Sequence, residues 1–384
     1  MTKKNIVMFL GAGASKAFSY PLTKEILMLI VDDIKSAVLF TDDGIDKEHA
    51  LLYQQLLQNL LISLSPGLKI LFSDDHAFDK DKLPLITDLL SQAEHLVNSN
   101  HALIDFNFEL PEHNNLLGKI GSMNERWTLK DVINLLEWAI IKVINKSGDN
   151  SNTQLGHFIN WVRETNTNKD AFISIITSNY DFSVESNLMV NEEKKNANKL
   201  IDYGFNWRNV DDANGEVYLR PVDPHFRFFK LHGSIDWLKC ERCGYIYINP
   251  TVDIYKLAFS NKHKPANMCH CNYWPLAPVL ITPSFSRTVN DTNLSQIWRN
   301  TGELLRTADE WIIVGYSLPG EDLDIKSLFI RALKGRDKEN PPDIKVIQHS
   351  DDSKEKYDNF FGRGSYEFYG EGFETYDFSK IRTN

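Results

Sequence analysis

Asn179, Asp181 and His232 combine side chains suited to catalysis with positions at the ends of apolar runs. Histidine is the side chain best matched to proton transfer near neutral pH. The amide of an asparagine both donates and accepts hydrogen bonds, so it can orient a hydroxyl group or a water. An aspartate at such a position also suits the cap of a following helix, and a lone histidine also suits a structural role. Residue type alone therefore leaves both interpretations open for Asp181 and His232.

A glycine-rich turn, Gly11-Ala-Gly-Ala-Ser15, follows the apolar run Ile6–Leu10. The run predicts a buried strand of a parallel sheet, and the periodicity of Lys24–Ile34 predicts a helix. A strand, a glycine-rich turn and a helix in this order can place backbone N–H groups against a phosphate. The turn is not a complete G-x-G-x-x-G motif, because its sixth residue is Lys16. A tight turn without a ligand is the alternative.

Further buried strands are predicted at 172–178, 228–233, 311–315 and 344–348. Apolar strands that alternate with helices predict an α/β fold with a doubly wound parallel sheet. In such a sheet the ligand crevice lies outside the carboxyl ends of the strands. Four strand ends carry unusual residues, and we expect them to converge on one cleft: Gly11–Ser15, Thr177–Asp181, His232–Gly233 and Gly315–Ser317.

A long, mainly helical stretch separates the first two predicted strands. Its apolar periodicity predicts helices over 49–64, 83–97, 128–144 and 155–165. We expect residues 46–165 to form a helical insertion or lobe within a single domain that covers residues 1–384. A small module over 236–280 completes the expected organisation.

All four cysteines lie in this module, as Cys240-x-x-Cys243 and Cys269-x-Cys271. Two close pairs separated by a short segment are typical of a tetrahedral, four-thiolate zinc site. Such a site is structural, because four thiolates leave no open position for water. The second pair is tighter than usual, so His263 or His270 could replace one ligand. Four reduced cysteines without a metal are the remaining alternative.

The composition narrows the class of protein. The chain has 384 residues, 42% of them apolar, and a net charge of −10. This balance argues against unspecific binding to nucleic acid, which needs a basic face. The N-terminal apolar run is too short for a signal peptide, and no apolar stretch approaches the length of a membrane span. We therefore expect a cytoplasmic protein that binds neither membranes nor nucleic acid directly.

Taken together, the motifs resemble the sirtuin (Sir2-type) family. In family order, they correspond to the GAG turn, the T-Q-N-x-D segment, the His-Gly pair, the zinc module and the G-T-S-L segment. The matching stretches here are Gly11-Ala-Gly-Ala-Ser15, Ser178-Asn-Tyr-Asp181, Leu231-His-Gly-Ser234, the two cysteine pairs and Gly315-Tyr-Ser-Leu-Pro319. The resemblance spans residue 6 to about 350 without the helical insertion, and implies a Rossmann-like sirtuin fold. Within the family, the motif set is most similar to that of the bacterial branch that consumes NAD in antiphage defence. This branch includes partners of HerA-type ATPases.

The resemblance also implies a role for each matching residue. Asn179 and Asp181 would lie at the nicotinamide and its ribose, and His232 would be the general base, so that Asn179 and His232 are the candidate catalytic residues. The Gly11–Ser15 turn would contact the pyrophosphate, Gly315–Ser317 the ribose-phosphate side, and Gln348 the adenosine. The candidate cofactor-binding residues are Gly11, Ala12, Gly13, Ser15, Thr23, Ser178, Asp181, Gly315, Tyr316, Ser317 and Gln348. The candidate ligands of a structural Zn²⁺ are Cys240, Cys243, Cys269 and Cys271.

Three departures from the deacetylating sirtuins bear on the expected activity. Phe18–Thr23 stands in place of the G-I-P-D-F-R loop, Thr177-Ser-Asn179 replaces T-Q-N, and Val279–Phe285 replaces the peptide-binding V-x-x-F-G-E stretch. These differences disfavour protein deacetylation and leave cleavage of the nicotinamide bond open. The favoured interpretation is an NAD⁺ glycohydrolase of antiphage defence, controlled by homo-oligomerisation or by a HerA-type ATPase. The alternatives are an NAD-dependent protein deacylase and a subunit that senses NAD or ADP-ribose.

Overall fold

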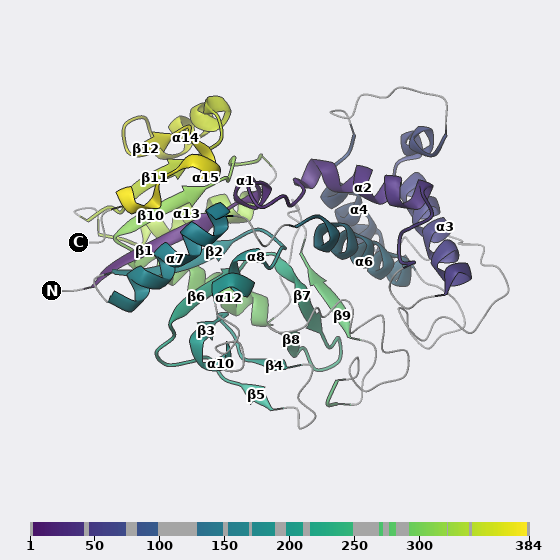
Figure 1. Ribbon diagram of the computed structural model, residues 1–384, viewed down its shortest axis with the longest axis horizontal. Helices are drawn as coiled ribbons and strands as arrows, with labels where there is room; N and C mark the ends of the chain where they lie inside the picture. Colours follow the sequence, from purple (N-terminus) through teal and green to yellow (C-terminus); the bar gives the residue numbers. More distant parts are fainter. Residues whose placement is uncertain are drawn as a thin grey trace.

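The computed structural model describes residues 3–41, 46–73, 83–98, 129–148, 153–168, 171–188, 197–209, 216–248, 269–271, 276–281, 292–320, 322–337 and 340–381. Figure 1 shows these residues in three parts: a large sheet with helices around it, a smaller sheet beside it, and a group of helices at the far end. None of the described helices is both long enough and apolar enough to cross a bilayer.

The large sheet is parallel throughout its seven strands. Its order is β12-β11-β10-β1-β2-β6-β3. The strands are β1 (Lys4–Leu10), β2 (Ala171–Thr177), β3 (Ile201–Asp202), β6 (Phe226–Lys230), β10 (Glu310–Val314), β11 (Asp343–Ile347) and β12 (Glu367–Tyr369). This order confirms the predicted doubly wound α/β fold, and the short edge strands β3 and β12 extend it.

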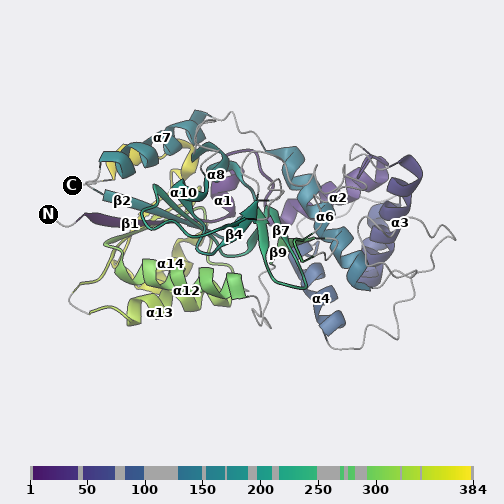
Figure 2. The ribbon, with the colours of Figure 1, turned by 90° about the horizontal axis from the view of Figure 1, so that it is seen from below.

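Helices cover both faces of this sheet, which explains its continuous apolar strands. Every residue of β10 is buried, as are the last five of β1. In Figure 2, α7 lies on one side of the sheet, and α12, α13 and α14 lie on the other. The covering helices are α7 (Thr153–Asn168), α12 (Thr292–Thr307), α13 (Leu323–Lys334), α14 (Lys354–Phe361) and the short α15 (Gly372–Thr375).

The group of helices contains α2 (Thr23–Lys35), α3 (Lys47–Leu64), α4 (Ile86–Asn98) and α6 (Leu129–Ser147), together with the 3-10 helix η1 (Pro66–Phe72). We call this group the helical lobe. Helix α6 is buried on almost every side, because it packs against α2, α3 and α4 and also contacts the small sheet. The predicted helices over 49–64, 83–97 and 128–144 are confirmed with small shifts of their ends. The fourth, α7, packs on β2 of the large sheet, and the domain limits stay a prediction.

The small sheet has the order β5-β4-β8-β7-β9. Its strands are β4 (Trp207–Asn209), β5 (Val217–Tyr218), β7 (Gly233–Lys239), β8 (Ile246–Ile248) and β9 (Ala277–Leu280). The remaining elements are α1 (Ala12–Lys16), α8 (Ser183–Leu188), α10 (Ala197–Leu200), η5 (Asp351–Ser353) and η6 (Phe378–Lys380). Strand β7 follows β6 after two residues, so the small sheet begins directly at the edge of the candidate site.

Candidate functional site

The switch point of the large sheet lies between β1 and β10. From β1 the chain continues to β2 on one side, whereas β10 leads to β11 on the other. The turns after these two strands are joined by backbone hydrogen bonds. Gly11 N–H donates to the Val314 carbonyl at 2.9 Å, and Gly13 N–H donates to the Gly315 carbonyl at 2.8 Å. The predicted glycine-rich turn therefore meets the predicted Gly315–Ser317 segment at the place where open α/β sheets bind ligands.

The glycines of both turns are needed for this contact. A Cβ atom on Gly11 would lie 2.6 Å from the Gly315 carbonyl oxygen, and one on Gly13 would lie 2.9 Å from the Gly315 Cα. Gly315 has a φ of +63°, and a Cβ there would lie 2.2 Å from the Ala14 nitrogen. The small residues of the turn thus admit the neighbouring backbone. Direct contact of Gly11 and Gly13 with a ligand stays a prediction.

A cavity of about 310 Å³ opens at this switch point, within the range of small-molecule sites. It is lined by most of the residues predicted to bind or act on a ligand: Ala12, Ser15, Thr23, Ser178, Asn179, Asp181, His232, Gly315, Tyr316 and Ser317. Gln348 is not part of this lining. Its amide donates to the Tyr316 carbonyl at 2.7 Å, and the Tyr357 hydroxyl donates to the same oxygen, so Gln348 supports the segment after β10.

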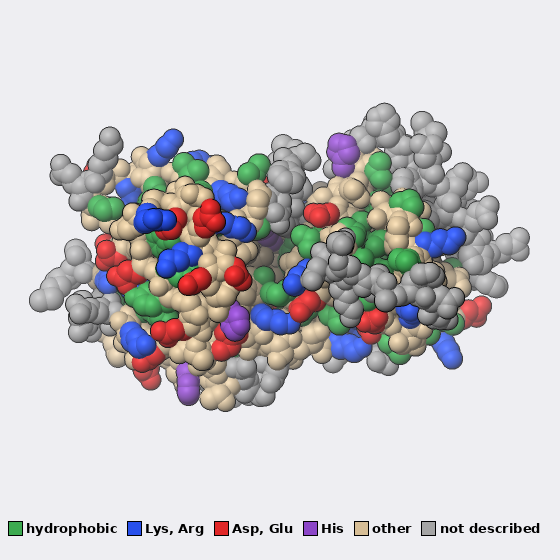
Figure 3. Space-filling view, turned by 90° about the horizontal axis from the view of Figure 1, so that it is seen from above, with side chains coloured by type: hydrophobic (Ala, Val, Ile, Leu, Met, Phe, Trp, Pro, Cys, Tyr) green, Lys and Arg blue, Asp and Glu red, His purple; other side chains and the backbone are tan. Residues whose placement is uncertain are grey.

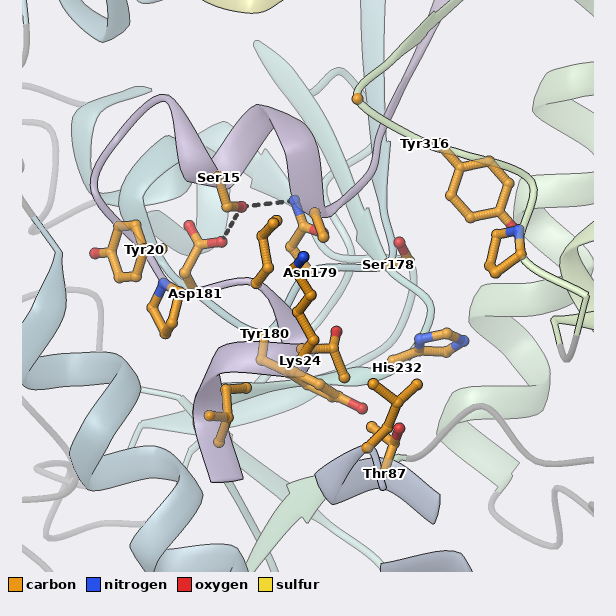
Figure 4. A pocket seen from close by; sticks show the side chains of 18 of the residues that line it. Ser15, Tyr20, Lys24, Thr87, Ser178, Asn179, Tyr180, Asp181, His232 and Tyr316 are labelled. Carbon is orange, nitrogen blue, oxygen red and sulfur yellow. Dashed lines mark hydrogen bonds between the residues drawn. The ribbon is translucent and has the colours of Figure 1, made fainter. Parts of the chain in front are cut away.

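Three polar side chains form one network at the edge of the cavity. The Asn179 amide donates to the Ser15 hydroxyl at 2.7 Å and to the Gly11 carbonyl at 2.8 Å. The Ser15 hydroxyl in turn donates to Asp181 at 2.5 Å. Figure 4 shows the three side chains meeting below α1. Since both amide hydrogens of Asn179 bond within the protein, its carbonyl oxygen is the atom that can accept from a water or a ligand hydroxyl.

Asp181 acts as a helix cap and also lines the cavity, whereas its role toward a ligand stays a prediction. One carboxylate oxygen accepts from Ser15, and the other accepts from the N–H of Ser183 at 3.1 Å and from its hydroxyl. The second set fixes the start of α8, as a helix cap does. The same side chain therefore joins the helix to the ligand cavity.

His232 lies on the opposite side of the cavity from Tyr20 (Figure 4) and is only 3% exposed. Its ring centroid lies 6.4 Å from that of Tyr180 and 6.3 Å from that of Trp298. Its backbone carbonyl accepts from Ile281 N–H at 2.8 Å. Burial beside these two rings holds the imidazole at the cavity wall.

The helical lobe supplies a wall that the sequence analysis does not predict. Tyr20, Lys24 and Thr87 line the cavity from the loop before α2, from α2 and from α4. Figure 4 shows Lys24 extending into the cavity toward Asn179, so a cation faces any ligand bound there. Burial, followed by the nearby carboxylates Asp181 and Glu185, raises the pKa of Tyr20 well above its usual range, so its hydroxyl stays protonated. Tyr20 lies in the Phe18–Thr23 loop and Lys24 begins a predicted helix, but no motif marks Tyr20, Lys24 or Thr87 as lining residues, because the lobe meets the sheet only in three dimensions.

The four cysteines form a second cluster in the small sheet. Their sulfur atoms all lie within 4.8 Å of one another. The pairs Cys240–Cys271 and Cys243–Cys269 have Sγ–Sγ distances of 3.6 and 3.3 Å. Four thiolates at a Zn–S distance of about 2.3 Å need similar spacings, so the residues fit a structural zinc ion.

Histidine is not needed to complete this cluster. His270 stacks on Tyr247, whose hydroxyl lies 2.8 Å from His270 Nδ1 and donates to Cys269 Sγ at 3.2 Å. Burial raises the pKa of Cys269, but hydrogen bonds from the Cys271 backbone and from Tyr247 outweigh it and lower this pKa to about 7. His270 therefore lies beside the four cysteines and contacts Tyr247. His263 lies outside the described residues.

The fold and the site together define an α/β protein with a ligand cavity at its switch point and a cluster of four cysteines. No family model matches the chain, and no curated protein matches it. It is similar to solved structures of Sir2 enzymes. A structure described as the basis for the mechanism and regulation of Sir2 enzymes is 13% identical with a TM-score of 0.41, covering 97% of this chain and 89% of that chain.

Two further solved structures illustrate the same likeness. Sir2 bound to an acetylated peptide is 11% identical with a TM-score of 0.35, and a Sir2 variant with a p53 peptide and NAD is 11% identical with a TM-score of 0.37. Both matches cover 97% of this chain and 90% of the other. At these identities and TM-scores, the similarities assign neither an activity nor a ligand to this chain.

Proposed function

We propose that the protein is an NAD⁺ glycohydrolase, which cleaves NAD⁺ with water to nicotinamide, ADP-ribose and a proton. The observation that carries this proposal is the convergence of four strand ends on one cavity at the switch point, in the order of the sirtuin motifs. These ends supply an amide, a carboxylate and an imidazole, and the helical lobe adds the Lys24 ammonium. This combination suits a ligand with a pyrophosphate, a ribose and a cationic leaving group.

The chemistry follows from where charge develops. As the bond to nicotinamide breaks, positive charge spreads over the ribose ring, and the Asp181 carboxylate at the cavity edge stabilises it. The carbonyl oxygen of Asn179 accepts a hydrogen bond from the attacking water. His232 takes the proton that this water releases.

The anionic end of NAD⁺ would lie along the turn after β1. The Lys24 ammonium reaches into the cavity beside this turn and can form a charge-assisted hydrogen bond to a phosphate oxygen. Thr23, at the first position of α2, adds a hydroxyl on the same side. Ser15 itself is bonded to Asn179 and Asp181, so it orders these side chains rather than donating its hydroxyl to phosphate.

The same proposal extends to the role in the cell. An enzyme that destroys NAD⁺ must be restrained until it is needed, and the motif set resembles defence proteins that deplete NAD⁺ during phage infection. We therefore place this activity in the cytoplasm. We propose that it is switched by the assembly of several copies of the chain or by a HerA-type ATPase. The helical lobe is the surface that such a partner can use to reach the cavity, because it forms one cavity wall.

The proposed reaction can be tested with purified protein and NAD⁺, with and without an acetylated peptide, in the presence and absence of the neighbouring gene's product. We expect equimolar nicotinamide and ADP-ribose without the peptide, and their loss in His232→Ala. Nicotinamide release that requires the peptide and forms acetyl-ADP-ribose would instead show a deacylase. NAD⁺ binding without turnover in every assembly state would show a sensor.

A further inference from the structure

Lys230 is an unusual residue at the carboxyl end of β6. It stands within the apolar sequence Phe228–Leu231 and is 0% exposed. A buried ammonium is costly unless hydrogen bonds and opposite charges compensate it. An apolar residue would fill this position of the strand without that cost. The contacts of Lys230 therefore call for a functional explanation.

The ammonium has a partner for each of its three hydrogens. It donates to Glu185 Oε1 at 2.6 Å, to the backbone carbonyl of Asp181 at 2.5 Å and to that of Tyr180 at 3.3 Å. Two of the three acceptors are thus backbone oxygens of the segment that carries Asn179 and Asp181. Lys230 does not line the ligand cavity, so it acts on the site from behind.

Strand β7 holds the same segment from a second side. The Tyr180 carbonyl also accepts from Ile235 N–H at 2.9 Å. The Tyr180 hydroxyl donates to the Ile281 carbonyl at 2.6 Å. The turn between β2 and α8 is therefore fixed at its backbone by β6 and β7, while the side chains of Asn179 and Asp181 bond to Ser15.

Glu185 supplies the third hydrogen-bond acceptor of the Lys230 ammonium. It is 4% exposed and lies on α8, one turn after the segment that Lys230 holds. Burial, which Lys230 opposes and Asp236 and Asp181 reinforce, raises the pKa of Glu185 to about 8. The ammonium is thus held by backbone oxygens at least as much as by a carboxylate, which links it to the shape of the turn.

We infer that Lys230 is a positioning residue of the site: its buried ammonium sets the backbone of Tyr180 and Asp181, and thereby aligns Asn179 and Asp181 with Ser15. This inference goes beyond the proposed function, because it applies to any ligand that Asn179 and Asp181 meet. Only its kinetic readout rests on NAD⁺ hydrolysis.

The test compares four variants of the full-length protein: Lys230→Met, the double variant Lys230→Met with Glu185→Leu, Glu185→Gln, and the control Lys345→Met. The double variant removes both charges, so it avoids the lone buried carboxylate that can unfold the single variant. The glutamine introduced by Glu185→Gln would still accept from the ammonium, and both backbone acceptors remain, so this variant keeps the turn in place at a cost in stability for the lost negative charge. Lys345 pairs with the buried Glu310 at the opposite end of the large sheet.

We expect the double variant to fold and to lose about 100-fold in kcat for NAD⁺ hydrolysis, with a smaller change in KM. Hydrogen exchange should accelerate at the backbone amides of 179–183 and stay unchanged in α13. Glu185→Gln and Lys345→Met should remain within a few-fold of wild type. A folded double variant with wild-type kcat would overturn the inference, because a merely structural pair can be replaced without effect on the site.

The exchange measurement separates this inference from the proposed function. Wild-type protein that leaves NAD⁺ intact in every assembly state would contradict the proposed hydrolysis alone. Unchanged exchange at 179–183 in the double variant would contradict the role of Lys230 alone.

Discussion

The Ser15 hydroxyl connects the ends of two strands, because it accepts from Asn179 and donates to Asp181. This use of both functions of one hydroxyl fixes the direction of each hydrogen bond in the network. The Asn179 carbonyl oxygen is thereby left to accept from a ligand or a water, and the Asp181 carboxylate is fixed at the cavity wall. At the scale of single residues, the site is ordered before a ligand binds, which reduces the cost of binding.

Lys24 gives a prediction for ligand affinity. Its ammonium extends into the cavity, so Lys24→Ala should raise the Kd for NAD⁺ about tenfold, the effect of losing one charge-assisted hydrogen bond. The loss should shrink at high salt, because screening weakens the contact in the wild type. Isothermal titration calorimetry measures both effects. Lys35→Ala, an exposed position in the last turn of the same helix, is the matched control, and an equal loss there would refute the role of Lys24.

Glu185 gives a prediction for the pH dependence of stability. Its pKa is about 8 in the folded protein against an ordinary value of 4.5, because burial disfavours the charged form. The folded state thus binds one more proton than the unfolded state between these values. The contribution to the free energy of unfolding is complete below pH 4.5 and is lost as pH rises through 8, at up to about 1.4 kcal/mol per pH unit.

Urea unfolding at several pH values measures this slope. Glu185→Gln cannot titrate, so the stability of wild type relative to the variant should fall steadily from about pH 5 to about pH 8. Parallel stability curves for the two proteins would show that Glu185 keeps an ordinary pKa.

At the scale of elements, the contact between the turns after β1 and β10 depends on Gly315. Its left-handed backbone and the 2.2 Å approach to Ala14 leave no room for a side chain. Gly315→Ala should cost about 2 kcal/mol or more of stability and should weaken NAD⁺ binding. Gly320 lies five residues later, and a Cβ there would have no other atom within 4 Å, so Gly320→Ala is the control. Thermal unfolding measures the stability of both variants. Equal melting temperatures would contradict the role of the contact between the two turns.

The cysteine cluster gives a prediction for metal removal. Four sulfur atoms within 4.8 Å of one another should bind one zinc ion per chain, which elemental analysis measures. Chelation should lower the melting temperature, because the turn between β7 and β8 then loses its cross-link to residues 269–271. The same treatment of Cys243→Ser should have little further effect. Metal-free protein with unchanged stability would support reduced cysteines instead.

Elements that bury a continuous apolar run are predictable from this sequence, and short or polar ones are not. Strand β1 is evident from Ile6–Leu10, whereas β3, β4 and β5 have two or three residues and no readable period. Helix α12 is absent from the sequence prediction, although its buried residues Leu294, Ile297, Thr301 and Leu305 have helical spacing. Its remaining surface is polar, as in an amphipathic helix, so the sequence does carry the signal for this element.

At the scale of the whole molecule, the large sheet, the small sheet and the helical lobe all reach the cavity. The turns of the large sheet supply Ser15, Asn179 and Asp181, and the lobe adds Lys24. The first strand of the small sheet to follow them, β7, bonds to the backbone of Tyr180, which lies between Asn179 and Asp181. Basic and acidic side chains are interspersed on the face shown in Figure 3.

The site was predictable to the extent that the sheet determines it. Strand ends of a parallel sheet lie at one edge, so Asn179, Asp181 and His232 could be placed together from their sequence positions. Lys24 and Thr87 could not, because the packing of a helical lobe on a sheet leaves no local signal. Lys230 does leave a local signal, because it is a single charge inside an apolar strand. Its role, however, depends on the carbonyls of Tyr180 and Asp181 that it contacts in the folded protein.

The rate of NAD⁺ loss in two matched variants is the most direct test that Asn179 acts in a cavity that hydrolyses NAD⁺. Asn179→Ala should reduce kcat by about 100-fold or more, because it removes the group that orients the attacking water. Asn187→Ala should retain wild-type kcat, since that amide bonds only to the start of α8 and lies outside the cavity lining. Equal rates of NAD⁺ loss for wild type and Asn179→Ala would contradict the account.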